Sequence, residues 1–104
     1  MSGLNKILKQ AQKMQQDLAR IQEELKTKNV EVTAGGGAIK VVASCDMRIQ
    51  SIDIKPEAID PQDIEMLQDL ILSGINQALE KAHQEHEIQM AKVTAGMSLP
   101  GMGM

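Results

Sequence analysis

The stretch Asn29-Val-Glu-Val-Thr-Ala-Gly-Gly-Gly-Ala-Ile-Lys-Val-Val-Ala-Ser44 decides the fold of this chain. Apolar and polar residues alternate over 29–34 and again over 38–44, and this period of two is typical of half-buried strands. The three glycines between the two runs can adopt the positive φ angles that a tight connection requires. The stretch therefore predicts a β-hairpin.

A glycine-rich loop can also bind phosphate, so the triple glycine has a second interpretation. A Walker loop requires Gly-Lys followed by Ser or Thr and leads into a helix. Here the glycines lead into a predicted strand, and no Lys-Ser or Lys-Thr pair follows them. We therefore interpret residues 35–37 as a hairpin turn and not as a nucleotide site.

A third strand is predicted over about residues 47–54, after a turn near residues 45–46. It carries Ile49, Ile52 and Ile54, and the step of three between the first two breaks the alternation. Such a break indicates either a β-bulge or a strand that begins later. The three strands together predict a small antiparallel sheet.

The segment before the hairpin has the pattern of a long amphipathic helix. No Gly or Pro interrupts residues 4–26, and we predict a helix over about residues 3–27. At 1.5 Å per residue it is about 35 Å long, whereas a compact domain of this size has a radius of gyration of about 13 Å. The helix should therefore project, and its apolar seam requires a partner, either the second long helix or a second copy of the chain. The seam follows heptad spacing and consists of Leu4, Ile7, Ala11, Met14, Leu18, Ile21 and Leu25.

A second long helix is predicted over about residues 61–94. In the sequence Asp60-Pro-Gln-Asp63, Asp60 can cap the helix and the proline suits its first position. The apolar face is broad early and narrow late, so the first half should pack on the sheet and the second half should run clear of it. Gly96 is a plausible helix stop. Residues 97–104 are rich in Met and Gly, and we expect a flexible tail.

Charge is distributed unevenly along the 104 residues, although the net charge is only −3. Residues 1–28 contain six bases and three acids, whereas residues 56–104 contain two bases and eight acids. The first sixteen residues contain no acid at all. This division predicts that the N-terminal part meets an anionic partner, although an ordinary solvated helix face would carry similar residues.

The basic residues of the first helix form a stripe beside the seam. Lys6, Lys13 and Arg20 are seven residues apart, and Lys9 lies on a neighbouring row. Regularly spaced cations suit the phosphate backbone of a nucleic acid, because binding them releases its counterions. Two hypotheses remain open from this feature: direct contact with duplex DNA, or a coiled-coil adaptor that binds another protein and uses the lysines only for solubility.

Other classes of function have little support in the sequence. Without Phe, Trp or Tyr the chain has no aromatic platform for stacking bases. Cys45 cannot form an intramolecular disulfide, and His83 and His86 have no evident third metal ligand. No paired carboxylates indicate a catalytic cleft, so we expect neither an enzyme nor a small-molecule substrate, cofactor or metal. Since no apolar run approaches about 18 residues, we expect a soluble protein of the cytoplasm with no membrane contact.

The order of the predicted elements and several short motifs resemble the YbaB/EbfC family of bacterial nucleoid-associated DNA-binding proteins. The likeness covers nearly the whole chain. Two departures, Gln68 in place of an acid and Gly74 in place of alanine, concern the packing of the second helix. The motifs are Met14-Gln-Gln16, Ala34-Gly-Gly-Gly37 with Ile39-Lys-Val41, Ile52-Asp-Ile54, Leu67-Gln-Asp-Leu-Ile71, Ile75-Asn-Gln-Ala-Leu79, Thr94-Ala-Gly96 and Leu99-Pro-Gly101.

This resemblance implies a single α+β domain over residues 1–96, with the order α-β-β-β-α, that forms a tweezer-like homodimer. The projecting helices would contact double-stranded DNA at the nucleoid and bend it, without catalysis and without a cofactor. The resemblance does not specify the binding residues. We nominate Lys6, Lys9, Lys13 and Arg20 from charge and spacing, and we expect little reading of base sequence.

Overall fold

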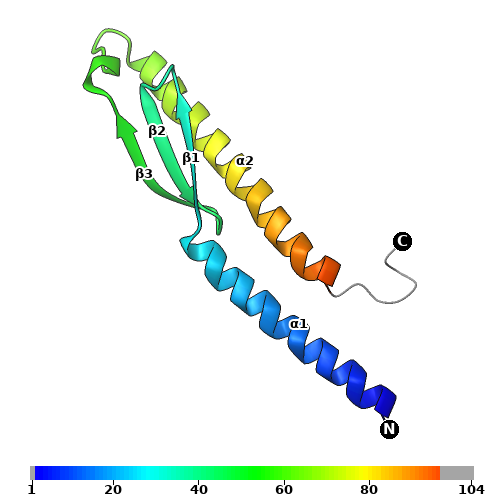
Figure 1. Cartoon of the computed structure of the whole chain (residues 1–104). Coiled ribbons are helices and arrows are strands. Elements are labelled where there is room, and N and C mark those ends of the chain that lie inside the picture. The colour runs from blue at the N-terminus through cyan, green and yellow to red at the C-terminus, as the bar shows by residue number, and fades with distance from the viewer. Residues whose placement is uncertain (1, 97–104) are drawn as a thin grey trace.

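The computed structural model describes residues 2–96 and contains the predicted elements in the predicted order (Figure 1). In chain order, helix α1 is followed by three strands, a short 3₁₀ helix called η1 and helix α2. The predicted flexible tail, residues 97–104, lies outside the described residues. The bounds are α1 Ser2–Thr27, β1 Asn29–Ala34, β2 Ile39–Ser44, β3 Arg48–Ile54, η1 Pro56–Ala58 and α2 Ile64–Gly96.

The three strands form one antiparallel sheet in the order β1-β2-β3. Gly35, Gly36 and Gly37 connect β1 to β2 with φ angles of +64°, +68° and +94°. Residues with a Cβ rarely adopt this left-handed region. The prediction of a hairpin turn with positive φ is therefore confirmed.

Strand β3 contains a bulge, which is one of the two alternatives that the spacing of its isoleucines left open. Val42 pairs with Ser51 and Ala43 pairs with Ile49, so Gln50 is the extra residue. The bulge reverses the alternation once, and for this reason Ile49 and Ile52 lie on the same face of the sheet although they are three residues apart.

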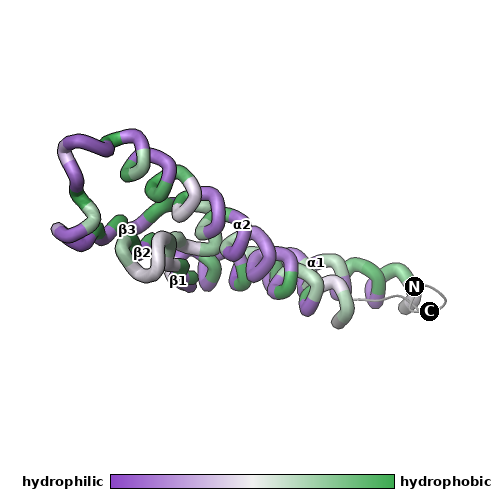
Figure 2. Tube along the Cα trace, turned by 90° about the horizontal axis from the view of Figure 1, so that it is seen from above, coloured by the Kyte–Doolittle hydropathy of each residue, from purple (hydrophilic) through white to green (hydrophobic). Residues whose placement is uncertain are grey.

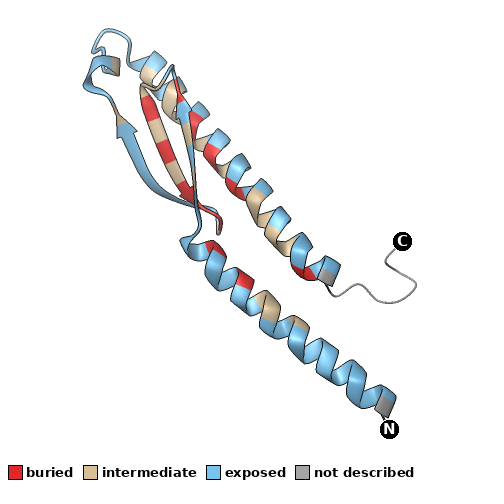
Figure 3. Ribbon diagram, viewed as in Figure 1, coloured by how far each residue is buried: buried red, intermediate tan, exposed pale blue. Residues whose placement is uncertain are grey.

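Helix α2 packs on one face of the sheet through small side chains. Ala78 and Ala82 are fully buried against Ile39, Val41 and Ala43 of β2, as the row of buried residues in Figure 3 shows. One turn earlier the approach is also close, because a Cβ at position 74, where glycine stands, would lie 3.0 Å from Cγ2 of Val41. Small residues therefore set the distance between helix and sheet.

Helix α2 begins three residues later than predicted. The carboxylate of Asp63, not that of Asp60, caps the helix by accepting the Met66 N–H at 3.2 Å. Asp60 instead accepts the Gln62 N–H at 2.9 Å, and its carbonyl accepts the Asp63 N–H at 2.9 Å. The Asp60 side chain therefore closes a local turn, in which proline occupies a favoured position, and is not available as a helix cap.

Helix α1 projects from the sheet, as predicted. The described part of the chain measures 74 × 26 × 16 Å, with a radius of gyration of 20.2 Å, against about 13 Å for a compact domain of this size. Figure 1 shows the N-terminal half of α1 extending away from the strands and beyond the end of α2. Among residues 2–96, neither long helix has a segment apolar enough to cross a membrane.

The close approach of α2 to the sheet yields a test by substitution. Gly74→Val places two methyl groups where Val41 already lies at 3.0 Å, so we expect the free energy of unfolding to fall by about 2 kcal/mol. Urea denaturation followed by circular dichroism measures this change. Asn76→Val, an exposed position on the same helix, is the matched control and should stay within about 0.5 kcal/mol of the wild type. Equal losses in the two variants would contradict this account of the packing.

Candidate nucleic-acid interface

The apolar seam of α1 is covered by the same chain only over its C-terminal part. Ile21 and Leu25 are 6% and 1% exposed and pack with Val93 of α2 and with Cys45. The second half of α2 thus runs clear of the sheet, as predicted, and covers the root of α1. Three partly buried residues complete this cluster: Leu18, Val30 and Met90.

The N-terminal part of the seam has no cover among the described residues. Leu4 and Ile7 are 57% and 62% exposed, and Ala11 is also exposed. Figure 2 shows hydrophobic residues continuing along α1 toward its N-terminal end. We call the part of α1 from residue 3 to residue 13 the arm, since α2 does not cover it.

The sequence analysis did not single out Met90 and Val93 as partners of the seam. A signal was present, because the buried face of α2 continues from Ala82 through His86 to these two residues in steps of four, four and three. Residues at such spacing share one side of a helix. Their role was missed because the apolar face of α2 is narrow in the second half of the helix, and its pattern does not indicate which residues it contacts.

An ion pair fixes the junction between α1 and β1. Lys28 Nζ lies 2.6 Å from Oε1 of Glu85 on α2, and Gln89 Nε2 donates to the same oxygen at 2.8 Å. The hydrogen bond from Lys28, with a second from Gln89, lowers the pKa of Glu85. The same hydrogen bond raises the pKa of Lys28. Apolar contacts and this ion pair therefore both join the C-terminal end of α1 to α2.

The two histidines have different partners and do not share a ligand site. His86 Nδ1 lies 3.2 Å from the carbonyl oxygen of Cys45, whereas His83 Nε2 lies 3.9 Å from Oε1 of Glu87. Cys45 is buried, and burial raises the pKa of its thiol. No group of three or more His, Cys, Asp or Glu side chains within residues 2–96 is placed to hold a metal ion.

The arm carries the lysines nominated from the sequence, and all are exposed. Lys6, Lys9 and Lys13 form no ion pair with any carboxylate of the described chain. No acidic residue precedes Asp17, and Asp17, one turn after Lys13, pairs with Arg20 instead. At 100° per residue these lysines point to the side of α1 roughly opposite the seam, so the interpretation of a stripe beside the seam is wrong. They therefore face away from α2 and remain accessible.

Arg20, the fourth nominated residue, differs from the three lysines. Its guanidinium group lies 3.5 Å from Oδ1 of Asp17 and 3.6 Å from Oε1 of Glu24. Exposed pairs of this kind contribute little to stability, but they neutralise the positive charge that a phosphate would meet. The structure thus brings the stripe together on one helix while dividing it into three unpaired lysines and one paired arginine.

Most of the other cations are also paired with acids. Only Lys55 and Lys92, besides the arm lysines, lack both a carboxylate partner and a backbone partner in the described part of the chain. The arm therefore has the densest group of unpaired cations, with three in eight consecutive residues. These paired cations are Lys26 with Glu23, Lys28 with Glu85, Lys40 with Glu31 and Asp53, and Arg48 with Asp46.

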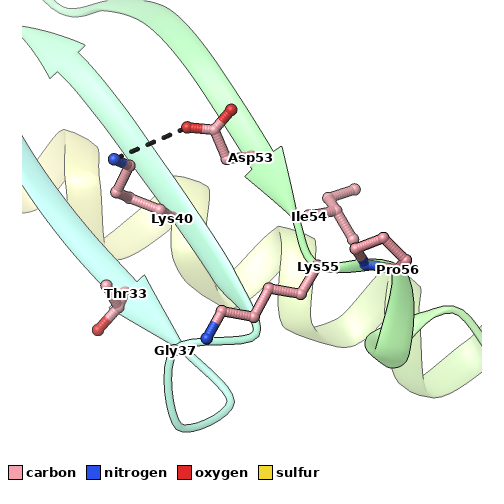
Figure 4. A pocket seen from close by; sticks show the side chains of 7 residues that line it. All are labelled: Thr33, Gly37, Lys40, Asp53, Ile54, Lys55 and Pro56. Carbon is pink, nitrogen blue, oxygen red and sulfur yellow. Dashed lines mark ion pairs between the residues drawn. The ribbon is translucent and has the colours of Figure 1, made fainter.

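A hollow of about 530 Å³ lies on the face of the sheet opposite α2, beside the glycine turn (Figure 4). Lys40 Nζ lies within it, 3.2 Å from Oε1 of Glu31 and 3.8 Å from Oδ2 of Asp53. Of the two lysines that line the hollow, Lys40 is paired twice, whereas Lys55 has no carboxylate partner in the described part of the chain. Its lining residues are Thr33, Gly37, Lys40, Asp53, Ile54, Lys55 and Pro56.

Comparison with known proteins connects this arrangement to a described family. The sequence profile of the YbaB/EbfC DNA-binding family matches residues 1–97. A protein of Pelotomaculum thermopropionicum named nucleoid-associated protein is 54% identical over 100 residues, covering 96% of this chain and 95% of that protein. A protein of the same name from Acetivibrio thermocellus is 53% identical over 101 residues, covering 96% of this chain and 89% of that protein.

The fold also has a counterpart among solved structures. The crystal structure of an uncharacterized protein from Helicobacter pylori superimposes with a TM-score of 0.73 and covers 90% of this chain and 96% of that one. The two sequences are 17% identical, so this likeness concerns the fold alone.

The ion pair between Lys28 and Glu85 predicts that the stability of the fold depends on pH. The pKa of Glu85 is lowered in the folded chain from 4.5, so its contribution to stability is present above the unfolded pKa and is lost as the pH falls through the folded pKa. We expect Glu85→Gln to reduce the free energy of unfolding at pH 6 and to have less effect at pH 3. Urea titrations at both pH values measure the difference. Glu80→Gln, an exposed residue on the same helix with no ion pair to a described residue, is the control; a pH-independent effect of Glu85→Gln would contradict the prediction.

Proposed function

This chain belongs to the YbaB/EbfC DNA-binding family, and from that premise we propose that it binds duplex DNA as a homodimer through the arms of α1. The family and the names of the relatives make it a nucleoid-associated DNA-binding protein. The finer parts of the proposal are the dimer, the use of the arms, bending of the duplex and weak sequence preference.

The observation that carries the proposal is the acid-free arm with its unpaired lysines. Lys6 and Lys13 are seven residues apart, which corresponds to about 10 Å along the helix axis, and Lys9 lies between them on the same side. Cations that have no carboxylate partner can neutralise phosphates without first losing an ion pair. Arg20 must exchange its contacts with Asp17 and Glu24, so its contribution should be smaller.

A homodimer gives this surface a geometry that a single arm lacks. One arm presents cations along one side of one rod, whereas two arms related by a two-fold axis can contact two parts of a duplex at a separation set by the protein. A duplex that does not match this separation must deform, and the free-energy cost of this deformation depends on how stiff its base sequence is. The dimer would thus bend DNA and select it mainly by shape.

Base reading through the arm should be slight. The amide side chains of the arm that can make bidentate contacts to base edges are Asn5, Gln10 and Gln12. The lysines contact phosphates, which carry no sequence information. We therefore propose binding with little sequence specificity in the cytoplasm, at the nucleoid, without catalysis, cofactor or small-molecule substrate.

The unpaired lysines provide the test. The triple variant Lys6→Gln, Lys9→Gln and Lys13→Gln should fold normally and bind mixed-sequence duplexes more weakly. The slope of log K against log salt should become shallower by about 0.9 for each lost phosphate contact. Fluorescence anisotropy at several salt concentrations measures both quantities.

A matched control removes three cations that are already paired: Lys26→Gln, Lys40→Gln and Arg48→Gln. This variant has the same change in net charge and should keep most of the wild-type slope. If both triples flatten the slope equally, the arm is not the DNA surface. If the wild type does not bind duplexes even at low salt, the coiled-coil adaptor becomes the better hypothesis.

A further inference from the structure

The arm has an apolar side that its lysines do not use. Leu4, Ile7 and Ala11 are exposed there, and Leu8, which is 51% exposed, widens the same side. We call these four residues the arm seam. Because the lysines point to the opposite side of the helix, a duplex bound to them would leave the arm seam in water. An exposed apolar surface of this kind is typical of an interaction site.

The covered end of the seam shows which kind of partner it accepts. Val93 of α2 packs against Ile21 and Leu25, and Figure 1 shows that α2 runs antiparallel to α1. Helix α2 ends at Gly96, whereas α1 continues from Ile21 toward residue 4 for about 25 Å. The same heptad pattern therefore extends beyond the end of α2, and it favours a second antiparallel helix as its cover.

The arm seam is complementary to itself when two arms lie antiparallel. If the two-fold axis passes near residue 9, Ile7 of each arm faces Ala11 of the other, so that a large side chain packs against a small one. The charged residues of the arm are its three lysines, which lie on the other side of the helix. The contact would therefore bury no charge.

The positive charge of two arms does not oppose this contact. Packed helices lie about 8–10 Å apart, and each has a radius of about 5 Å with its side chains, so the outer sides of the pair are about 20 Å apart. The lysines of the two arms lie on these outer sides. Their separation exceeds the Debye length of about 8 Å at physiological salt, and their repulsion is largely screened.

We propose that the arm seam is covered by the arm seam of a second dimer, and that the two paired arms join two DNA duplexes. Each arm turns its lysines outward, so the pair presents cations on two opposite sides, one for each duplex. The joining of duplexes rests on the proposed function, whereas the contact between arms does not require DNA. One such contact covers only about three helical turns, but many contacts between the same two duplexes act together.

The test removes the apolar side chains of the arm seam without changing its charge. Leu4→Gln combined with Ile7→Gln should fold normally, because both positions are exposed and Gln is a good helix former. In sedimentation velocity the wild type at high concentration should form a species heavier than the homodimer. The double variant should raise the dissociation constant of this association by about tenfold or more.

A capture assay measures the joining of duplexes. An immobilised duplex should retain a second, fluorescent duplex when the wild type is present, and the double variant should lose this capture. The double variant should still bind a single duplex with the wild-type salt slope, because all three arm lysines remain. Ile88→Gln changes a residue of α2 that is 52% exposed, and this control should behave as the wild type in both experiments.

The outcomes separate the contact between arms from DNA binding. Wild-type association that the double variant abolishes, in a protein that binds no duplex, would support the contact and overturn the proposed function. Equal capture by the wild type and the double variant would overturn the joining of duplexes through the arm seam. The contact would also be overturned if only a variant lacking residues 97–104 associated beyond the dimer, because those residues would then be the cover of the arm seam.

Discussion

The close packing of α2 on β2 is the constraint from which the rest of the structure follows. Small residues at positions 74, 78 and 82 allow the helix to contact Ile39, Val41 and Ala43 directly. A helix that lies this close to β1 and β2 cannot also cover β3. It leaves Ile49 and Ile52 exposed at one side, and it carries its remaining turns past the sheet, where Val93 covers the root of α1.

The division of charge then gives the projecting helix its chemical character. Beyond the cluster around Ile21 and Leu25, α1 has no neighbour among the described residues and no acid of its own. Its lysines are unpaired for both reasons. From Asp17 onward acidic residues occur on the helix, and Arg20, Lys26 and Lys28 all form ion pairs. The boundary between unpaired and paired cations thus coincides with the C-terminal end of the arm.

Local patterns anticipated the fold well, and the failures have physical causes. The hairpin turn, the bulge in β3 and the projection of α1 each depend on a short-range rule of backbone geometry or periodicity. The start of α2 was misplaced because Asp60 and Asp63 are equally good caps by sequence, and only the local turn shows which carboxylate is already engaged. For the candidate site, the four cations were nominated from charge and spacing, and spacing gave no indication that Arg20 is paired.

The sequence by itself determined the elements, their order, the long acid-free helix and the lysines along it, because periodicity and composition act over a few neighbouring residues. Tertiary structure decided which apolar residues are covered. The local sequence does not distinguish Ile21 from Ile49 as a core residue. Ile21 is nevertheless buried against Val93, whereas Ile49 is exposed. The reason is that burial depends on where α2 lies across the sheet, and contacts between residues far apart in the chain set that position.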